Sequence, residues 1–243
     1  MAHLLRLLTI VTLLVNGLLN GQLNVVTNHD DKRGYQPLRN DADGRKRQHH
    51  AVRKAPPGLP TLLGNTVSEK GTILMIDWAR GLASGTLDGA VQATVADDLA
   101  VNGSRPEYVR VGQRWLVATA DYGAQANEVR LYDPEVLKTA ARTSEPGVLV
   151  HRFRSSPYVQ TLHWLDGPGL LVLVQNTQDG QGWRLTVVDL ARSIQAGAEQ
   201  VTLTTDLAPS SELEGFHVLA PGRGLFVTSA PVSNVYFANV RLF

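Results

Sequence analysis

Three aspartates, Asp77, Asp133 and Asp189, lie 56 residues apart, and each closes a segment rich in β-forming residues. Around each aspartate the chain repeats the same order of strand-like segments and turns, which indicates a protein built from repeated units. A repeat of this length that is made of strands is typical of the blades of a β-propeller. The repeat therefore predicts an all-β chain whose four-stranded units lie around a common axis.

The clearest unit covers residues 108–153 and contains four short apolar segments separated by polar turns. Its third segment alternates apolar and polar residues, which is the pattern of a strand with one covered face. Asp133 follows that segment and Pro134 comes next. We therefore expect an aspartate N-cap and a short helix between the third and fourth strands.

The other units follow this plan with differences. Residues 159–205 repeat it closely, residues 51–95 repeat it less clearly, and residues 215–242 contain only three strand-like segments. The sequence thus predicts a propeller of about four four-stranded blades within residues 48–243. Residues 23–27 also read as a strand, and we expect them to complete the last blade beside residues 235–242, because ring closure removes an exposed edge. The alternative is an incomplete arc of a larger propeller.

The N-terminus has the layout of an export signal. Arg6 precedes an apolar run that ends at Asn16, and this run is shorter than the roughly 18 residues of a spanning helix. We interpret residues 1–21 as a signal peptide, with an uncleaved signal anchor as the alternative. Residues 22–47 form a polar, basic segment. We expect a secreted or periplasmic protein that is not stably inserted in a membrane once the signal is cleaved.

Charge and cysteine content restrict which partners and which sources of stability we expect. The chain has 23 basic and 22 acidic side chains, a formal net charge of +1 and no cysteine. Such a balance gives no general field that would attract nucleic acid, so we expect no nucleic-acid partner. Without cysteine, stability has to come from the packed core and not from disulfides.

Polar side chains at the starts of the innermost strands would meet at one face of a propeller, although they are far apart in sequence. The candidates for a binding site at this channel face are His50, Glu107, Gln160, His163, Glu214 and His217. Carboxylates and histidines together can hold a divalent cation or exchange protons. The alternative interpretation is that these side chains are polar only because the channel contains water.

Aspartate and asparagine also occur where turns are expected. Asp121 and Asn176 end the second strands of two units, and we interpret them as turn residues that bond the local backbone. Asp77, Asp133 and Asp189 are interpreted as caps of the connections that follow them.

Three short stretches resemble a known group of proteins. Residues 129–134 and 185–190 are similar to the strand, aspartate and short connection of secreted bacterial propellers of the YVTN, lactonase-like and SMP-30-like kind. Residues 213–216, Leu-Glu-Gly-Phe, resemble the opening of an innermost strand in gluconolactonase proteins. That resemblance implies that Glu214 is a metal ligand and that Ca²⁺ or another divalent cation could bind.

Two functions from different classes follow. The first is an exported, non-catalytic propeller that binds a small molecule or a protein partner at its channel face, with no cofactor. The second, implied by the resemblance, is a metal-dependent hydrolase of lactone or ester bonds. Sequence motifs for a serine nucleophile, a zinc protease helix or a phosphate-binding loop are absent from the chain.

Overall fold

The computed structural model describes residues 48–53, 55–67, 70–84, 87, 89–177, 182–207, 212–220, 222–228 and 235–242. For residues 48–53, 65–67 and 82 it describes the backbone alone. The expected signal peptide (residues 1–21), the polar segment (residues 22–47) and the expected closing strand (residues 23–27) lie outside the described residues. Within the described ranges, no helix has both the length and the apolar character that a membrane crossing demands.

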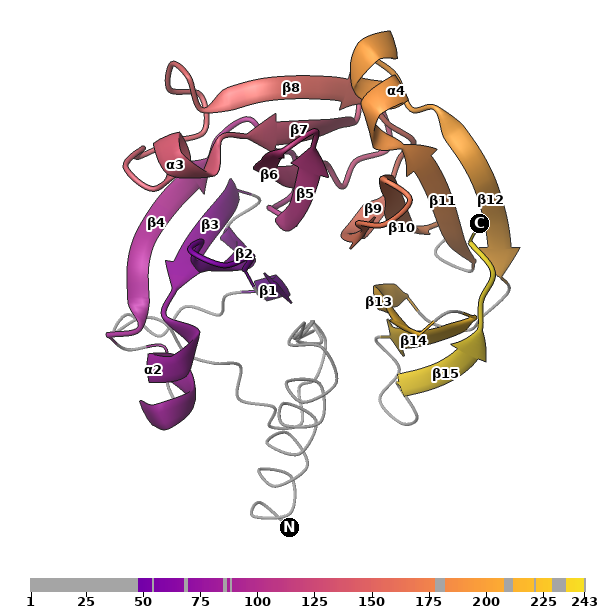
Figure 1. Ribbon diagram of the computed structural model, residues 1–243, viewed down its shortest axis with the longest axis horizontal. Helices are drawn as coiled ribbons and strands as arrows, with labels where there is room; N and C mark the ends of the chain where they lie inside the picture. The colour runs from indigo at the N-terminus through magenta and orange to yellow at the C-terminus, as the bar shows by residue number, and fades with distance from the viewer. Residues whose placement is uncertain are drawn as a thin grey trace.

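The chain is all-β, with four antiparallel sheets that follow one another along the sequence (Figure 1). The first sheet has the strands β1 (Gln48–Arg53), β2 (Thr61–Val67), β3 (Lys70–Ile76) and β4 (Val91–Asp97). The second has β5 (Glu107–Val111), β6 (Arg114–Ala120), β7 (Glu128–Tyr132) and β8 (Leu149–Arg154). The third has β9 (Val159–Leu165), β10 (Leu170–Asn176), β11 (Trp183–Asp189) and β12 (Val201–Leu207). The last has β13 (Leu213–Ala220), β14 (Arg223–Thr228) and β15 (Val235–Asn239).

The four sheets lie side by side in an arc (Figure 1). The first strand of each sheet, β1, β5, β9 or β13, lies on the inside of the arc, and β4, β8 and β12 lie on the outside. In each sheet, neighbouring strands in space are also neighbours in sequence. This arrangement confirms the predicted all-β repeat and is compatible with a propeller-like fold.

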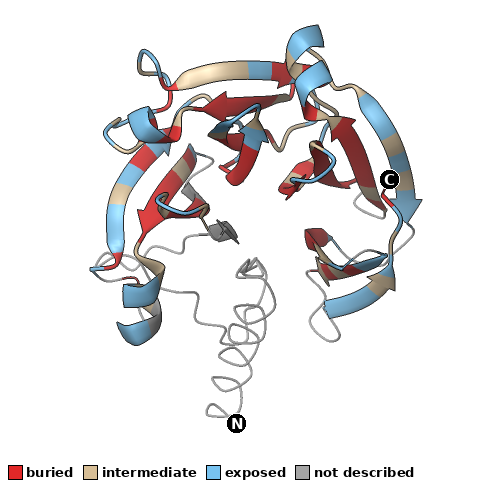
Figure 2. Cartoon of the chain, viewed as in Figure 1, coloured by how far each residue is buried: buried red, intermediate tan, exposed pale blue. Residues whose placement is uncertain are grey.

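Apolar side chains fill the spaces between successive sheets. One cluster joins the first and second sheets, a second joins the second and third, and a third joins the third and last. Trp183 of β11 and Phe226 of β14 stack across the last of these interfaces, with ring centroids 6.0 Å apart. In Figure 2 the inner and middle strands of the second and third sheets are mostly buried, whereas the outer strands β4, β8 and β12 are mostly exposed or intermediate.

The three repeated aspartates cap the connections that follow them, as predicted, and each connection contains a helix. The helices are α2 (Trp78–Ser84), α3 (Pro134–Leu137) and α4 (Leu190–Ala196). Asp77 Oδ1 accepts from the Arg80 amide at 3.0 Å, and Asp189 Oδ1 accepts from the Arg192 amide at 2.9 Å. Asp133 Oδ1 accepts from two amides of α3. Each carboxylate therefore satisfies donors that a helix start leaves unpaired.

The segment that leads into the second sheet crosses the first sheet at close range. If Gly64 had a Cβ atom, that atom would lie 2.2 Å from the Ser104 carbonyl oxygen and 2.4 Å from Pro106 Cδ. The buried carboxylate of Asp97 accepts hydrogen bonds from the hydroxyls of Ser104 (2.5 Å) and Tyr132 (2.7 Å). Close backbone contact and a buried carboxylate thus join the first two sheets.

Candidate functional site

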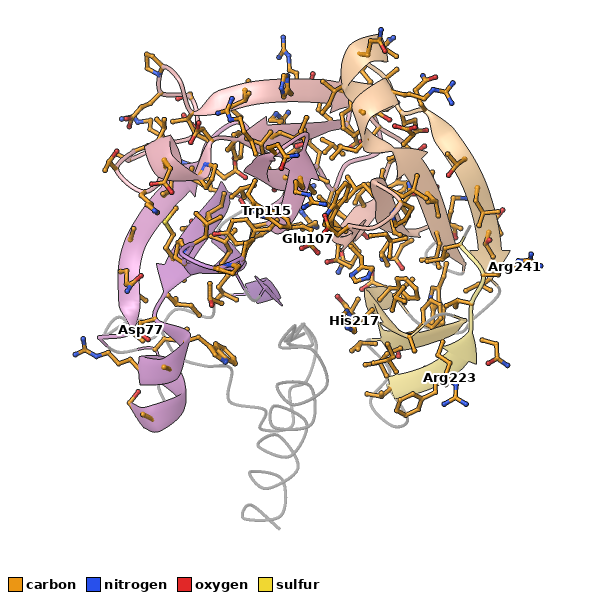
Figure 3. The ribbon with its side chains drawn as sticks, viewed as in Figure 1. Asp77, Glu107, Trp115, His217, Arg223 and Arg241 are labelled. Atoms are coloured by element: carbon orange, nitrogen blue, oxygen red, sulfur yellow. The ribbon has the colours of Figure 1, made fainter. Side chains whose placement is uncertain are left out.

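Three predicted site residues lie at matching places on inner strands. Glu107 is the first residue of β5, Gln160 is the second residue of β9, and Glu214 is the second residue of β13. All three belong to strands on the inside of the arc. Glu107 and His217 lie at the inner side of the arc (Figure 3). His50 belongs to β1, and its side chain lies outside the described residues.

The structure brings Gln160 and Glu214 together. The Gln160 Nε2 atom donates to Glu214 Oε2 over 2.5 Å, so the contact links β9 of the third sheet to β13 of the last sheet. Glu214 is buried, with 9% of its surface exposed. Burial raises the pKa of the Glu214 carboxyl to about 7, and the negative charge of Glu212 acts in the same direction. The Gln160 amide and the positive charge of Arg105 oppose this rise.

The structure also brings His163 and His217 together. Their rings meet edge to face with centroids 5.0 Å apart, and His163 makes a similar contact with Phe216 at 5.7 Å. The His163 Nε2 atom accepts from the Val218 amide at 3.4 Å, which joins β9 to β13 a second time. Both histidines are almost fully buried. They therefore form part of the packed junction between the third and last sheets, next to the Gln160–Glu214 pair.

Sequence reasoning missed Arg105, the one described cation whose charge acts on Glu214. Arg105 is 2% exposed, and its Nη1 donates to the carbonyl oxygens of Asn102 and Gly103. Burial lowers the pKa of its guanidinium to about 10, and the charge of Glu214 is among those that oppose the decrease. The sequence signal was its position two residues before Glu107, in the segment that enters an inner strand.

Two tyrosines beside Arg105 were missed as well. The Arg105 guanidinium carbon lies 5.0 Å from the centroid of the Tyr122 ring, and that ring meets the Tyr158 ring edge to face at 5.8 Å. Both tyrosines are half-buried. A cation, two aromatic rings and a buried carboxyl therefore lie in one neighbourhood at the start of the inner strands, an arrangement suited to binding polar or aromatic groups.

The loops that carry these residues are strained and bonded to one another. Asn102, Ala126 and Tyr158 have φ between 56° and 57°, and they are the non-glycine residues with positive φ among those the structure describes. The Asn102 side-chain Nδ2 donates to the Tyr122 carbonyl at 2.8 Å, and the Tyr158 backbone amide donates to the Gly123 carbonyl at 3.1 Å. Such strain gathers at functional sites, where the surrounding structure holds it in place.

The interpretation of Asp121 and Asn176 as turn residues that bond the local backbone was wrong, because their partners lie on other segments of the chain. Asp121 accepts from the amides of Glu128 (2.9 Å) and Val101 (2.8 Å), and it forms a paired contact with the buried Arg130 guanidinium. Asn176 Oδ1 accepts from the amide of Leu213 at 2.8 Å. Asn176 thereby fixes the residue immediately before Glu214, which makes it a positioning residue for the site.

A metal site needs several ligand side chains around one point. Within the described part of the chain, no group of three histidine, aspartate or glutamate side chains is placed to hold a metal ion. The metal-ligand role of Glu214 therefore stays a prediction.

One cavity of about 560 Å³ lies beside Asp77, Trp78 and Lys138, and another of about 450 Å³ lies beside β15. Neither is lined by the residues that surround Glu214.

Comparison of the sequence with protein-family models and with curated proteins finds no match, so the site is interpreted from its geometry.

Proposed function

We propose that this chain is a propeller-type binding protein that holds a polar ligand, either a small molecule or a segment of a protein, at the starts of β5, β9 and β13. The four sheets are the blades of the proposed propeller, and the inner strands provide the binding face. Export to the periplasm or the cell exterior is part of this proposal. Its basis is the apolar N-terminal run of the sequence.

The observation that carries the proposal is the buried carboxyl of Glu214. A desolvated carboxyl without a full set of charge partners lowers stability, and such groups gather at functional sites. Gln160 supplies an amide, Arg105 supplies a cation, and the half-buried rings of Tyr122 and Tyr158 supply apolar faces. These groups together offer hydrogen-bond donors, acceptors and aromatic surface to one ligand.

A thermal-shift screen tests this proposal with monosaccharides, amino acids and polyamines as probes, at pH 6 and pH 8. A compound that binds the folded state stabilises it by RT ln(1 + [L]/Kd), so the melting temperature rises with the concentration of the compound. We expect at least one class to raise it for the wild type and to lose this effect in Glu214→Gln and Gln160→Ala. The matched control is Glu135→Gln, an exposed carboxylate on α3. A shift that survives in both site variants contradicts the proposal.

The hydrolase is the second candidate, and the pKa of Glu214 favours it. A carboxyl with a pKa of about 7 exchanges protons well at neutral pH, which suits a general acid or base. For this function we expect Ca²⁺ or Zn²⁺ to raise the melting temperature of the wild type but not of Glu214→Ala, together with hydrolysis of a simple lactone. If neither the shift nor the hydrolysis is observed, the hydrolase is excluded and only the binding function remains.

A further inference from the structure

The charged side chains around the start of the inner strands are mostly acidic. Glu212 is exposed directly before β13, and Glu214 is buried in the same strand. Glu107, which is buried, starts β5. Arg105 is the described cation whose charge acts on Glu214. Because carboxyl groups outnumber cations here, the charge of this region suits a cationic ligand better than an anionic one.

The protein itself already surrounds the Arg105 guanidinium. Its Nη1 donates to two backbone carbonyl oxygens, and its central carbon lies 5.0 Å from the centroid of the Tyr122 ring. Burial lowers the pKa of this guanidinium, and the groups that oppose the decrease are Tyr122, Glu214, Asp121 and Asp97. With 2% of its surface exposed, Arg105 belongs to the wall of the site and is a poor anchor for an anionic ligand.

Two aromatic rings lie beside the carboxyl groups. Tyr122 and Tyr158 are half-buried, and their rings meet edge to face with centroids 5.8 Å apart. Burial raises the pKa of the Tyr122 hydroxyl, and the negative charges of Glu212 and Glu214 act in the same direction, so both carboxyl groups lie within electrostatic range of that ring. Carboxylates next to aromatic faces are the surroundings that bind organic ammonium groups.

The loop that carries Tyr122 also contains a buried acceptor. Asn127 is 4% exposed, and its Nδ2 donates to the Gly123 carbonyl oxygen, which also accepts from the Tyr158 backbone amide. Asn127 Oδ1 accepts no hydrogen bond from the residues that the structure describes. Buried acceptors normally have a donor, because leaving one unpaired lowers stability. The N–H groups of an ammonium ligand are donors of the kind that this acceptor requires.

We propose that the ligand is a small organic ammonium compound with an apolar body, and that its cation lies between the carboxyl groups of Glu212 and Glu214 and the rings of Tyr122 and Tyr158. This inference rests on the proposed binding function and specifies its ligand. Gln160 holds the Glu214 carboxyl in place from β9. The apolar body of the ligand packs against the two tyrosine rings.

Binding of such a cation should release a proton. The pKa of the Glu214 carboxyl is about 7 in the free protein, because burial and the charge of Glu212 raise it more than Gln160 and Arg105 lower it. An ammonium group next to Glu214 favours the carboxylate, so below pH 7 the carboxyl proton passes to solvent as the ligand binds. The ligand keeps its own proton, since amines of this type titrate near pH 10. Its affinity should therefore rise about tenfold from pH 6 to pH 8.

Isothermal titration calorimetry tests this with three probes that share one aromatic ring. Phenethylamine is the cation, 2-phenylethanol is the neutral analogue and 3-phenylpropionate is the anion. We expect phenethylamine to bind at least tenfold more tightly than the other two. At pH 6, titrations in phosphate and in MES, which differ in their enthalpy of ionisation, should show release of about one proton. At pH 8 the release should be close to zero.

Site variants and a control locate the bound cation. Glu214→Gln should abolish the proton release and weaken phenethylamine at least tenfold at pH 8, whereas the exposed control Glu135→Gln should leave both unchanged. Tyr158→Leu should weaken phenethylamine about threefold or more, and Tyr158→Phe should retain the wild-type affinity, because the ring and not the hydroxyl meets the cation. Melting temperatures confirm that each variant is folded.

The outcomes separate this inference from the proposed function. If the neutral or the anionic probe binds as tightly as phenethylamine and Glu214→Gln abolishes that binding, the inference is overturned while the binding function stands. Phenethylamine binding that releases no proton at pH 6, or that Glu214→Gln leaves intact, also overturns the inference. If these three probes and every compound of the thermal-shift screen fail to bind, the inference and the proposed function are both overturned.

Discussion

Gln160 and Glu214 are 54 residues apart in sequence, yet their side chains meet at 2.5 Å across the junction of the third and last sheets. Each stands near the start of an inner strand, so the contact is a consequence of repetition. Two units with the same order of strands place their second inner residues side by side. The carboxyl of this pair is buried and holds its proton near neutral pH.

Glu214 should make the stability of the protein depend on pH. The pKa of its carboxyl is about 7 in the folded chain, against an ordinary value of 4.5. Because the folded state binds the proton more tightly, the free energy of unfolding falls as the pH rises from about 4.5 through about 7 and then levels off. The gap between the two pKa values corresponds to roughly 3 kcal/mol.

Glu214→Gln keeps the shape of the side chain and removes this proton. Urea denaturation at pH 5, 6, 7 and 8 should show a clear decrease for the wild type and a smaller one for Glu214→Gln. The exposed control Glu135→Gln should follow the wild type. Parallel decreases for all three proteins would show that another group causes the pH dependence.

Asp121 should be far more important for stability than an exposed aspartate with the same type of partner. It is fully buried and accepts from the buried Arg130 guanidinium at 2.6 Å and 3.1 Å. Asp121→Ala removes the buried partner of that guanidinium and leaves it only the more exposed Glu128 carboxylate, 3.1 Å away, at a cost of about 3–5 kcal/mol. Asp206→Ala removes the equivalent partner of Arg184 on the surface and should change little. Chemical denaturation of both variants measures the contrast, and equal losses contradict it.

Gly64 should not tolerate a methyl group. An alanine Cβ there would lie 2.2 Å from a backbone oxygen, which has no freedom to rotate away. We expect Gly64→Ala to lower the free energy of unfolding by about 3 kcal/mol or more, since the first two sheets must separate locally. Gly167→Ala is the matched control, because a Cβ at Gly167 meets nothing within 4 Å. A melting temperature for Gly64→Ala equal to that of the control contradicts the close approach of the two segments.

The cap at Asp133 should contribute measurably to the second sheet. Its carboxylate accepts from the amides of Glu135 (2.8 Å) and Val136 (3.3 Å), and it also pairs with Arg114. Asp133→Ala should lower the free energy of unfolding by about 1 kcal/mol, and Asp133→Asn should recover part of the loss because asparagine also caps helices. Thermal denaturation distinguishes the two. No difference between them would contradict capping through a side-chain oxygen.

The repeat of aspartates and alternating strands predicted most of the fold because both patterns are local. The strands of the third sheet lie between residues 159 and 207, close to the predicted unit of residues 159–205, and α3 begins at Pro134 as expected. Helix α2 was missed, since residues 78–84 contain Gly81 and have no proline at the first helical position. The same local rules that identify α3 do not identify α2.

The site was predictable only where a side chain lies on an inner strand. Glu107, Gln160 and Glu214 satisfy that rule, and two of them are in direct contact. Arg105 and the tyrosine pair Tyr122 and Tyr158 lie in loops whose conformation depends on long-range hydrogen bonds and positive φ. No local sequence pattern encodes those contacts, so the aromatic and cationic part of the site appears only in three dimensions.

The most direct test of the binding site is the titration of Glu214 itself. The side-chain carboxyl carbons of glutamates labelled with ¹³C can be followed by NMR from pH 3 to pH 9 in the wild type and in Glu214→Gln. We predict one carboxyl with a midpoint near pH 7 in the wild type, and its signal should be missing in the variant. If every glutamate in the folded wild type titrates below about pH 5, Glu214 is not the buried, proton-holding centre of the site.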